Sequence, residues 1–277
     1  MPWIRVDGSS LEFLELGSGP PVVLLHSSGA SGAQWRALIE RLAANYHVIA
    51  PDLCGYGSTS GWSGRRAFGL AHEAALLDAL LARLDAPVHL VGHSYGGAVA
   101  LHMARTRPGR LASLALFEPV AFHLLRGGDA HDEAAFLEIG EVAATVVRSL
   151  ACGDHAAGTA HFVDYWSGPG AWNALPALRQ DAMAARLPKI ALDFHASFHE
   201  PASPLDFAHI DVPVLLMRGD RSPRPAQRVC GRLARCWPEL PIRIVRGAGH
   251  MAPLTHRDEV NEQIVAHLEA CRLERAA

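Results

Sequence analysis

Apolar residues along the chain follow two alternating patterns. Short, almost wholly apolar runs predict strands buried on both faces, and they lie at residues 22–27, 46–60 (where the strand runs into a glycine-rich loop), 88–94, 111–119, 212–220 and 242–250. Between them, apolar residues recur at helical spacing: Trp35, Leu38, Ile39 and Leu42; Leu77, Leu80, Leu81 and Leu84; Val260, Ile264 and Leu268. A hairpin around Asp7 and Gly8 is predicted at the start of the chain. Strands that alternate with helices predict an α/β fold, a mostly parallel sheet with helices on both faces.

One interval, residues 121–209, breaks this rhythm. It is too long for a plain loop, and its segments 132–151 and 173–188 are rich in good helix formers. In a parallel sheet, ligands bind outside the carboxyl ends of the strands. We therefore predict an inserted helical cap (lid) at 121–209, over the strand ends of a core domain formed by residues 1–120 and 210–277.

Composition excludes several function classes. Of 277 residues, 49% are hydrophobic and 19% charged, and a net charge of −3 gives no electrostatic basis for binding nucleic acid or an anionic membrane. No run approaches the roughly 18 apolar residues of a membrane span, and the first residues do not resemble a signal peptide. The five cysteines are scattered without C-x-x-C pairs, which favours a reducing compartment. We expect a cytoplasmic protein whose partner is a small-molecule substrate; the oligomeric state stays open.

The segment Gly92-His93-Ser94-Tyr95-Gly96 lies between a predicted strand and a predicted helix. It matches G-x-S-x-G, a sharp turn that needs small residues beside the serine so that strand and helix can approach. The turn places the serine at a helix N-terminus, where backbone N–H groups favour a developing negative charge. This pattern predicts that Ser94 is a nucleophile.

A serine hydroxyl needs a neighbouring base to take its proton. Of sixteen histidines, His250 follows the last strand, in "GAGHMAP", beside the other strand ends. His26 also follows a strand, but we expect it to brace the loop after it. His195 and His199 stand one helical turn apart, a spacing that can bind metal; no third ligand is evident, so no metal site is expected.

Four motifs together resemble the α/β-hydrolase fold family over nearly the whole chain: "HSSGASGAQW" (26–35), "DLCGYGSTS" (52–60), "GHSYGG" (92–97) and "GAGHMAP" (247–253). The resemblance implies a serine hydrolase with a helical cap and no cofactor. It implies Ser94 as nucleophile and His250 as general base. It also implies an oxyanion hole formed by the backbone N–H groups of Ser28 and Tyr95.

The chain departs from that family at two positions. Ser27 stands where the family usually has glycine, which could alter the oxyanion loop or let a hydroxyl assist. Many members place the triad acid three residues after the glycine of the "VPVLLMRG" strand, where this chain has Ser222. Glu118, at the end of the strand before the cap, is our preferred acid, since a branch of the family places its acid there. Asp220 is the alternative.

These residues predict acyl transfer to water through an acyl-enzyme, with an ester or thioester of a small to medium apolar acid as substrate. Tyr165, Trp166 and Trp172 are expected to line an apolar pocket, although such aromatic residues also suit the cap's own core. Hydrolysis of a carbon–carbon bond in a diketone uses the same triad and is an alternative. A hydrolase-like small-molecule receptor with little turnover, or a peroxidase-like enzyme without cofactor, is a further one.

Overall fold

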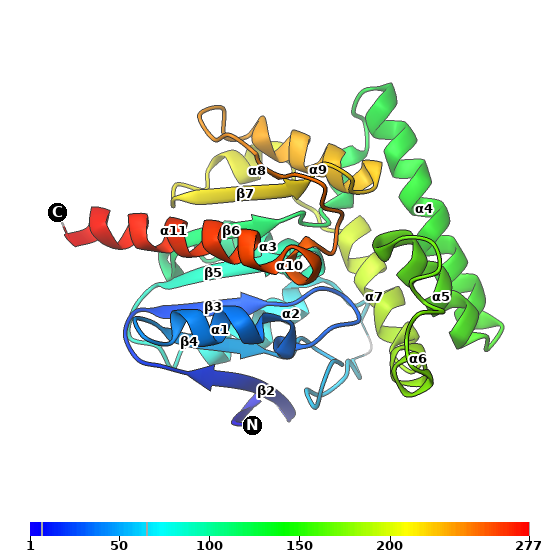
Figure 1. The fold of residues 1–277 in the computed structure, drawn as a ribbon, viewed down its shortest axis with the longest axis horizontal. Helices are drawn as coiled ribbons and strands as arrows, with labels where there is room; N and C mark the ends of the chain where they lie inside the picture. The colour runs from blue at the N-terminus through cyan, green and yellow to red at the C-terminus, as the bar shows by residue number, and fades with distance from the viewer. Residues whose placement is uncertain (7, 65, 277) are drawn as a thin grey trace.

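The computed structural model describes residues 1–6, 8–64 and 66–276, and within them the strands form one eight-stranded sheet (Figure 1). The strand order is β1-β2-β4-β3-β5-β6-β7-β8. The strands are β1 (Trp3–Val6), β2 (Ser9–Leu16), β3 (Pro21–Leu25), β4 (His47–Pro51), β5 (Val88–His93), β6 (Leu111–Phe117), β7 (Val214–Gly219) and β8 (Arg243–Val245). β1 pairs antiparallel with β2 and β2 with β4, and the other pairs are parallel.

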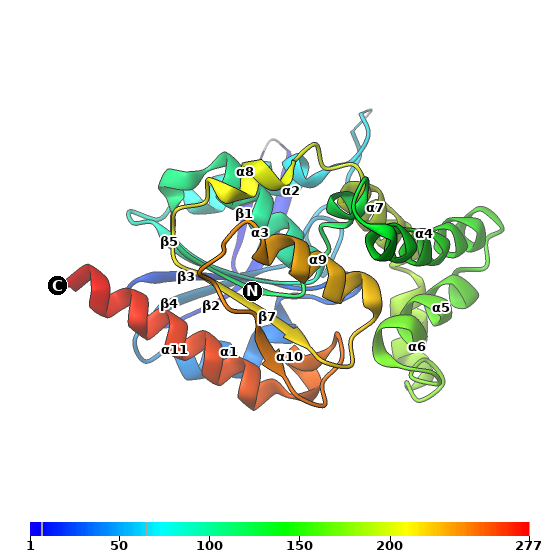
Figure 2. The same ribbon diagram turned by 90° about the horizontal axis from the view of Figure 1, so that it is seen from above.

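Helices cover both faces of the sheet (Figure 2). α1 (Arg36–Leu42) and α11 (Arg257–Ala276) lie on one face, and α2 (Leu70–Leu81), α3 (Tyr95–Thr106) and α9 (Arg224–Ala234) lie on the other. The predicted apolar stripes account for this packing: Leu38 and Ile264 share one buried cluster, while Leu77 and Leu80 belong to the cluster on the opposite face. β3, β5 and β6 are buried along their whole length, as their continuous apolar runs predict.

Four helices extend beyond the carboxyl ends of the strands (Figure 1): α4 (Ala130–Ala151), α5 (His155–Ser167), α6 (Ala177–Ala184) and α7 (Leu187–Phe198). Ion pairs fasten the first of them to the core, because Arg228 of α9 binds Asp129 and Asp132 at 2.6 and 2.7 Å. Two short helices, α8 (Pro204–Ala208) and α10 (Ala252–Thr255), lie in connections of the core. The predicted α/β fold with an inserted helical lid is confirmed.

The element boundaries differ from the predicted ones in two places. The run 242–250 forms only the three-residue strand β8, because the chain turns at Gly247, which has φ +71°. The helix expected over 173–188 is divided between α6 and α7, and Pro188 lies in the first turn of α7. β1 and β2 form the predicted antiparallel hairpin, while Asp7 lies outside the described residues. No helix of the described chain is long and apolar enough to span a bilayer.

Candidate active site

Ser94 occupies a strained turn between β5 and α3. Its φ of 56° and ψ of −117° are unusual for a residue with a side chain. The glycines on either side are needed for steric reasons. A Cβ on Gly92 would lie 2.5 Å from the carbonyl oxygen of Gly96, and a Cβ on Gly96 would lie 2.4 Å from that of Leu25. The glycine-rich sequence therefore allows the backbone to approach closely enough to lift the serine to the strand ends.

A continuous chain of hydrogen bonds joins Ser94, His250 and Glu118. The Ser94 hydroxyl lies 2.9 Å from Nε2 of His250, and Nδ1 of that ring lies 2.6 Å from Oε2 of Glu118. All three side chains are buried. Because a carboxylate accepts, Nδ1–H donates to Glu118 and Nε2 is left to accept from the serine, which is the tautomer that a general base requires.

Glu118 is held toward the histidine from its other side. Its φ of 43° is left-handed, and its Oε1 accepts hydrogen bonds from the Gly219 N–H at 2.7 Å and from the Ser222 hydroxyl at 2.5 Å. Ser222, three residues after Gly219, thus donates to the carboxylate of Glu118. Asp220 does not contact His250; it is exposed and accepts from the Gly247 N–H at 2.8 Å.

Ser28, in the loop after β3, lines the same cavity as Ser94, and Tyr95 is the first residue of α3, directly after Ser94. In the described chain, neither the Ser28 N–H nor the Tyr95 N–H donates to a protein acceptor. The Ser27 N–H, by contrast, has an acceptor: it and the Ser27 hydroxyl both donate to Oε1 of Gln34, at 3.1 and 2.8 Å. The Gln34 amide nitrogen in turn donates to Nδ1 of His93 at 3.1 Å. Ser27 therefore joins the loop after β3, through Gln34 and His93, to the strained turn at Ser94, called the elbow below.

Two buried histidines brace these segments as neutral rings. His26 donates from Nδ1 to the Ser27 carbonyl at 2.8 Å and accepts at Nε2 from the Leu53 N–H at 2.9 Å. Burial lowers its pKa to about 3. His93 donates from Nε2 to the His250 carbonyl at 2.9 Å, and burial likewise holds its pKa well below the usual value. Protonation of either ring would replace an accepting nitrogen by a donor facing a donor.

Next to the loop after β3 lies a buried ion cluster, defined here as Lys189 and Asp193 of α7 and Glu73 of α2. The Lys189 ammonium lies 3.1 Å from Glu73 and also binds Asp193. Asp193 accepts from the Ser28 hydroxyl at 2.6 Å, and Glu73 accepts from the Tyr95 hydroxyl at 3.2 Å. Burial alone would lower the pKa of Lys189, but the two carboxylates raise it above its ordinary value. The cluster connects the cap to both residues that carry the free N–H groups.

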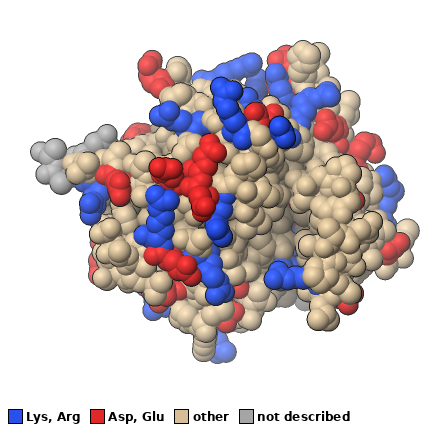
Figure 3. Space-filling view, viewed as in Figure 1, with Lys and Arg blue, Asp and Glu red and all other residues tan. Residues whose placement is uncertain are grey.

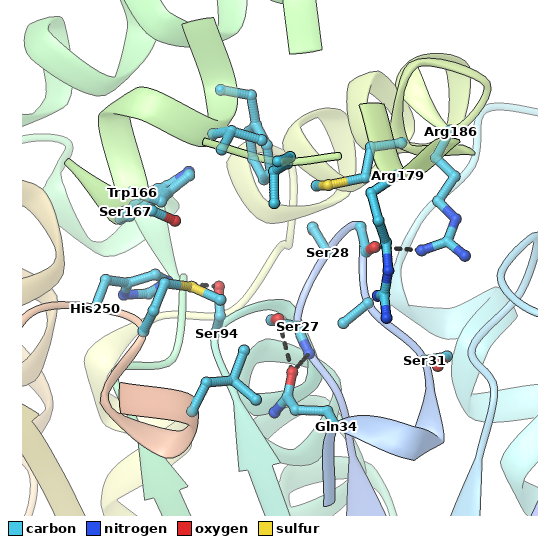
Figure 4. A pocket seen from close by; sticks show the side chains of 18 of the residues that line it. Ser27, Ser28, Ser31, Gln34, Ser94, Trp166, Ser167, Arg179, Arg186 and His250 are labelled. Atoms are coloured by element: carbon cyan, nitrogen blue, oxygen red, sulfur yellow. Dashed lines mark hydrogen bonds between the residues drawn. The ribbon is translucent and has the colours of Figure 1, made fainter. Parts of the chain in front are cut away.

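A cavity of about 740 Å³ opens onto Ser94 between core and cap (Figure 4). Trp166 lines it and lies over His250, with ring centroids 4.1 Å apart. Tyr165 and Trp172 are not among the lining residues. Tyr165 instead donates its hydroxyl to Glu138 at 2.8 Å, and the backbone N–H of Trp172 donates to Asp164 at 2.7 Å.

The described residues bring no group of three or more His, Cys, Asp or Glu side chains together as a metal site. His195 and His199 stack on each other with centroids 4.2 Å apart. Sequence reasoning missed Gln34 and Lys189 as parts of the site. Gln34 stands within the "HSSGASGAQW" motif, and Lys189 is the only lysine of the chain, which is the signal in the sequence that distinguishes it.

Comparison with known proteins supports the same family. Residues 22–263 match the alpha/beta hydrolase family. The chain is 41% identical to the 2-hydroxy-6-oxo-2,4-heptadienoate hydrolase of Pseudomonas putida over 137 residues, 46% of this chain and 48% of that protein. It is 31% identical to the dihydrolipoyllysine-residue acetyltransferase component of an acetoin cleaving system of P. putida, over 95% of this chain and 68% of the relative. The first of these matches thus spans only about half the length of the relative.

The fold is shared with solved structures at lower identity. The enol-lactonase from Burkholderia xenovorans LB400 superposes with a TM-score of 0.76 at 19% identity, covering 97% of this chain and all of that one. A likeness at this identity concerns the fold. The family match covers most of the sequence, and relatives of the chain are named hydrolases and esterases. The chain belongs to the alpha/beta hydrolase family.

Proposed function

We propose that this enzyme is a serine hydrolase that cleaves an ester, thioester or similar acyl bond of a small to medium substrate. One observation carries the proposal: the buried hydrogen-bonded series Ser94–His250–Glu118, with distances of 2.9 and 2.6 Å. The free Ser28 and Tyr95 N–H groups support it as oxyanion donors. In this proposal residues 121–209 act as the cap that closes over the site.

In the first half of the reaction, the Ser94 oxygen attacks the substrate carbonyl while Nε2 of His250 takes its proton. The two backbone N–H groups stabilise the resulting oxyanion. His250 then protonates the leaving group, and Glu118 stabilises the imidazolium that forms in between. In the second half, a water molecule gives its proton to His250, attacks the acyl-enzyme and releases the acid and Ser94. No metal or cofactor takes part in these steps.

Hydrolysis of a carbon–carbon bond is a second candidate, favoured by one observation. The relative named 2-hydroxy-6-oxo-2,4-heptadienoate hydrolase is 41% identical over the aligned 137 residues. The same nucleophile and oxyanion donors would serve a ketone substrate, with a carbanion in place of an alkoxide as leaving group. A substrate panel therefore includes vinylogous 1,5-diketones beside esters and thioesters.

The test is labelling with a fluorophosphonate, read by intact mass. We expect one adduct on the wild-type enzyme and none on Ser94→Ala, since the reagent captures only an activated serine. Turnover of the panel is then compared between the two proteins, and the variant should lose activity by at least about a hundredfold. Labelling that persists in folded Ser94→Ala, or activity retained by it, would remove Ser94 from the mechanism. Labelling without multiple turnover would favour a receptor.

A further inference from the structure

The charged residues that line the large cavity all have one sign. Arg36, Arg179 and Arg186 lie in its wall, and no aspartate or glutamate is among its lining residues. Over the chain as a whole, 25 basic residues are balanced by 28 acidic ones, and both signs are interspersed on the face seen in Figure 3. A cleft with uncompensated guanidinium groups has a positive potential that concentrates anions.

Two of these arginines reach into the cavity from the cap. Arg179 belongs to α6, and Arg186 directly precedes α7. Figure 4 shows both side chains on the Ser28 side of the cavity, across from Trp166 and His250. Nη1 of Arg186 donates to the Gly29 carbonyl at 2.5 Å, which fixes that guanidinium over the oxyanion loop. Its remaining N–H groups have no protein acceptor within the described residues.

The guanidinium groups of Arg36 and Arg179 are also available to bind an anion. Arg36 is the first residue of α1, on the core side of the cavity, and both Arg36 and Arg179 are exposed. In the part of the chain that the structure describes, neither forms an ion pair, in contrast to Arg107, which binds Asp78 at 2.6 Å. Arginine donors in a planar fork suit a carboxylate or a phosphate.

A second, smaller pocket at Ser94 has a different character. It is lined mostly by apolar side chains, Val120, Phe122, Phe162, Trp166 and Phe194, beside Ser28, Ser197 and Asp193. The two pockets meet at Ser94, so the site has a small apolar end and a larger, positively charged end.

We propose that the substrate carries an anionic group, a carboxylate or a phosphate, on the part that lies in the large cavity, where Arg36, Arg179 and Arg186 bind it. The pocket beside Phe122 and Phe194, with a volume of about 20 Å³, has room for an apolar group of about methyl size. This proposal rests on the proposed function, since it assumes that the reacting bond lies at Ser94. It adds a charge requirement that the triad alone does not impose.

Competition for Ser94 tests the charge requirement. A neutral fluorophosphonate labels the serine in the presence of hexanoate, hexyl phosphate or the uncharged hexanamide. We expect at least one of the two anions to protect Ser94 at a concentration about tenfold lower than hexanamide, as for a charge-assisted hydrogen bond. The more protective anion identifies the group. Added salt should weaken protection by the anion but not by the amide.

Variants assign the effect to the cavity arginines. The double variant Arg36→Gln/Arg179→Gln should remove the advantage of the anion and leave protection by hexanamide within twofold. Arg41→Gln is the matched control, since Arg41 is an exposed arginine of the same helix as Arg36 and does not line the cavity. Equal protection of the wild-type enzyme by anion and amide, or an advantage that is undiminished in the double variant, which keeps Arg186, overturns the proposal.

The outcome is separable from that of the proposed function. If wild-type enzyme is not labelled at all, the nucleophile assignment fails. Anion binding is then measured by the tryptophan fluorescence of Trp166, which lines the cavity, with Trp166→Phe giving the background. A titration with the two anions that matches the one with hexanamide again overturns the anion site, and tighter binding of an anion supports it.

Discussion

Replacing Glu118 by glutamine tests the assignment of the triad acid most sharply, because the structure shows why an amide cannot fill this place. The carboxylate accepts three hydrogen bonds, from the Gly219 N–H, the Ser222 hydroxyl and Nδ1–H of His250. A glutamine side chain has one oxygen and one NH₂ group. If the oxygen faces Gly219 and Ser222, the NH₂ group faces Nδ1 of His250, which must then give up its proton.

The loss of rate follows from that change of tautomer. With the proton on Nε2, His250 points a donor at the Ser94 hydroxyl and cannot take its proton. A triad whose aspartate is replaced by asparagine loses about 10⁴ in kcat for this reason. We expect Glu118→Gln to lose about 10³–10⁴ in kcat, which corresponds to about 4–5.4 kcal/mol of transition-state stabilisation at 1.36 kcal/mol for each factor of ten. KM should change little, because the carboxylate does not line the cavity.

The assay is steady-state hydrolysis of the best ester from the panel, together with the rate of fluorophosphonate labelling. Asp220→Asn is the matched control: it removes a carboxylate at the neighbouring strand end whose one hydrogen-bond donor among the described residues is the Gly247 N–H, and it should keep kcat within about threefold. Circular dichroism and the urea midpoint show that each variant is folded. Retention of more than a tenth of kcat in folded Glu118→Gln would refute the reasoning, as would a larger loss in Asp220→Asn.

Three further results are expected. Ser222→Ala removes a donor to the Glu118 carboxylate and should lower kcat by about 10–100-fold, the equivalent of about 1.5–3 kcal/mol for a charged hydrogen bond; an unchanged kcat would argue against support by Ser222. Lys189→Met leaves two buried carboxylates without their cation and should cost about 3–5 kcal/mol in urea unfolding, and a cost under about 1 kcal/mol would contradict that view of the ion cluster. At pH 7 His26 is mostly neutral in the folded and in the unfolded chain. Below its unfolded pKa of about 6.5 only the unfolded chain binds a proton at this ring, since the folded pKa is about 3. The free energy of unfolding should therefore fall by about 2 kcal/mol between pH 7 and 5 because of this ring. Urea unfolding at both pH values measures that loss, which His26→Gln should reduce, and an equal pH dependence of the two proteins would exclude His26 as its source.

The parts of the site that were predictable from the sequence are those set by local spacing. The elbow around Ser94 needs glycine within two residues on both sides, and a strand before it and a helix after it are visible as apolar patterns. His250 stands at the end of the last strand in the same way. Strand ends of a parallel sheet meet at one edge, so their assembly follows once the strands are recognised.

The choice of acid and the support of the oxyanion loop depend on side-chain directions and on distant contacts. Glu118 and Asp220 both follow strands, and only the left-handed backbone of Glu118 and the donors around it show which carboxylate faces His250. Lys189 lies 116 positions from Glu73 in the sequence, and nothing local to either residue reveals their contact. Contacts such as that between Lys189 and Glu73 depend on how the cap helices pack on the core. Hydrophobic periodicity along the sequence does not reveal that packing.

The burial of the ion cluster also has a practical consequence for chemical labelling. Lys189 is the only lysine in the chain and is 6% exposed. Only an unprotonated amine reacts with an acylating reagent. The two carboxylates raise the pKa of Lys189, so its amine stays protonated, and the side chain is also buried. In the folded protein, Lys189 should therefore react with such reagents only when α7 moves away from the core. The rate at which this single lysine is acylated would therefore report how often the cap opens and exposes it.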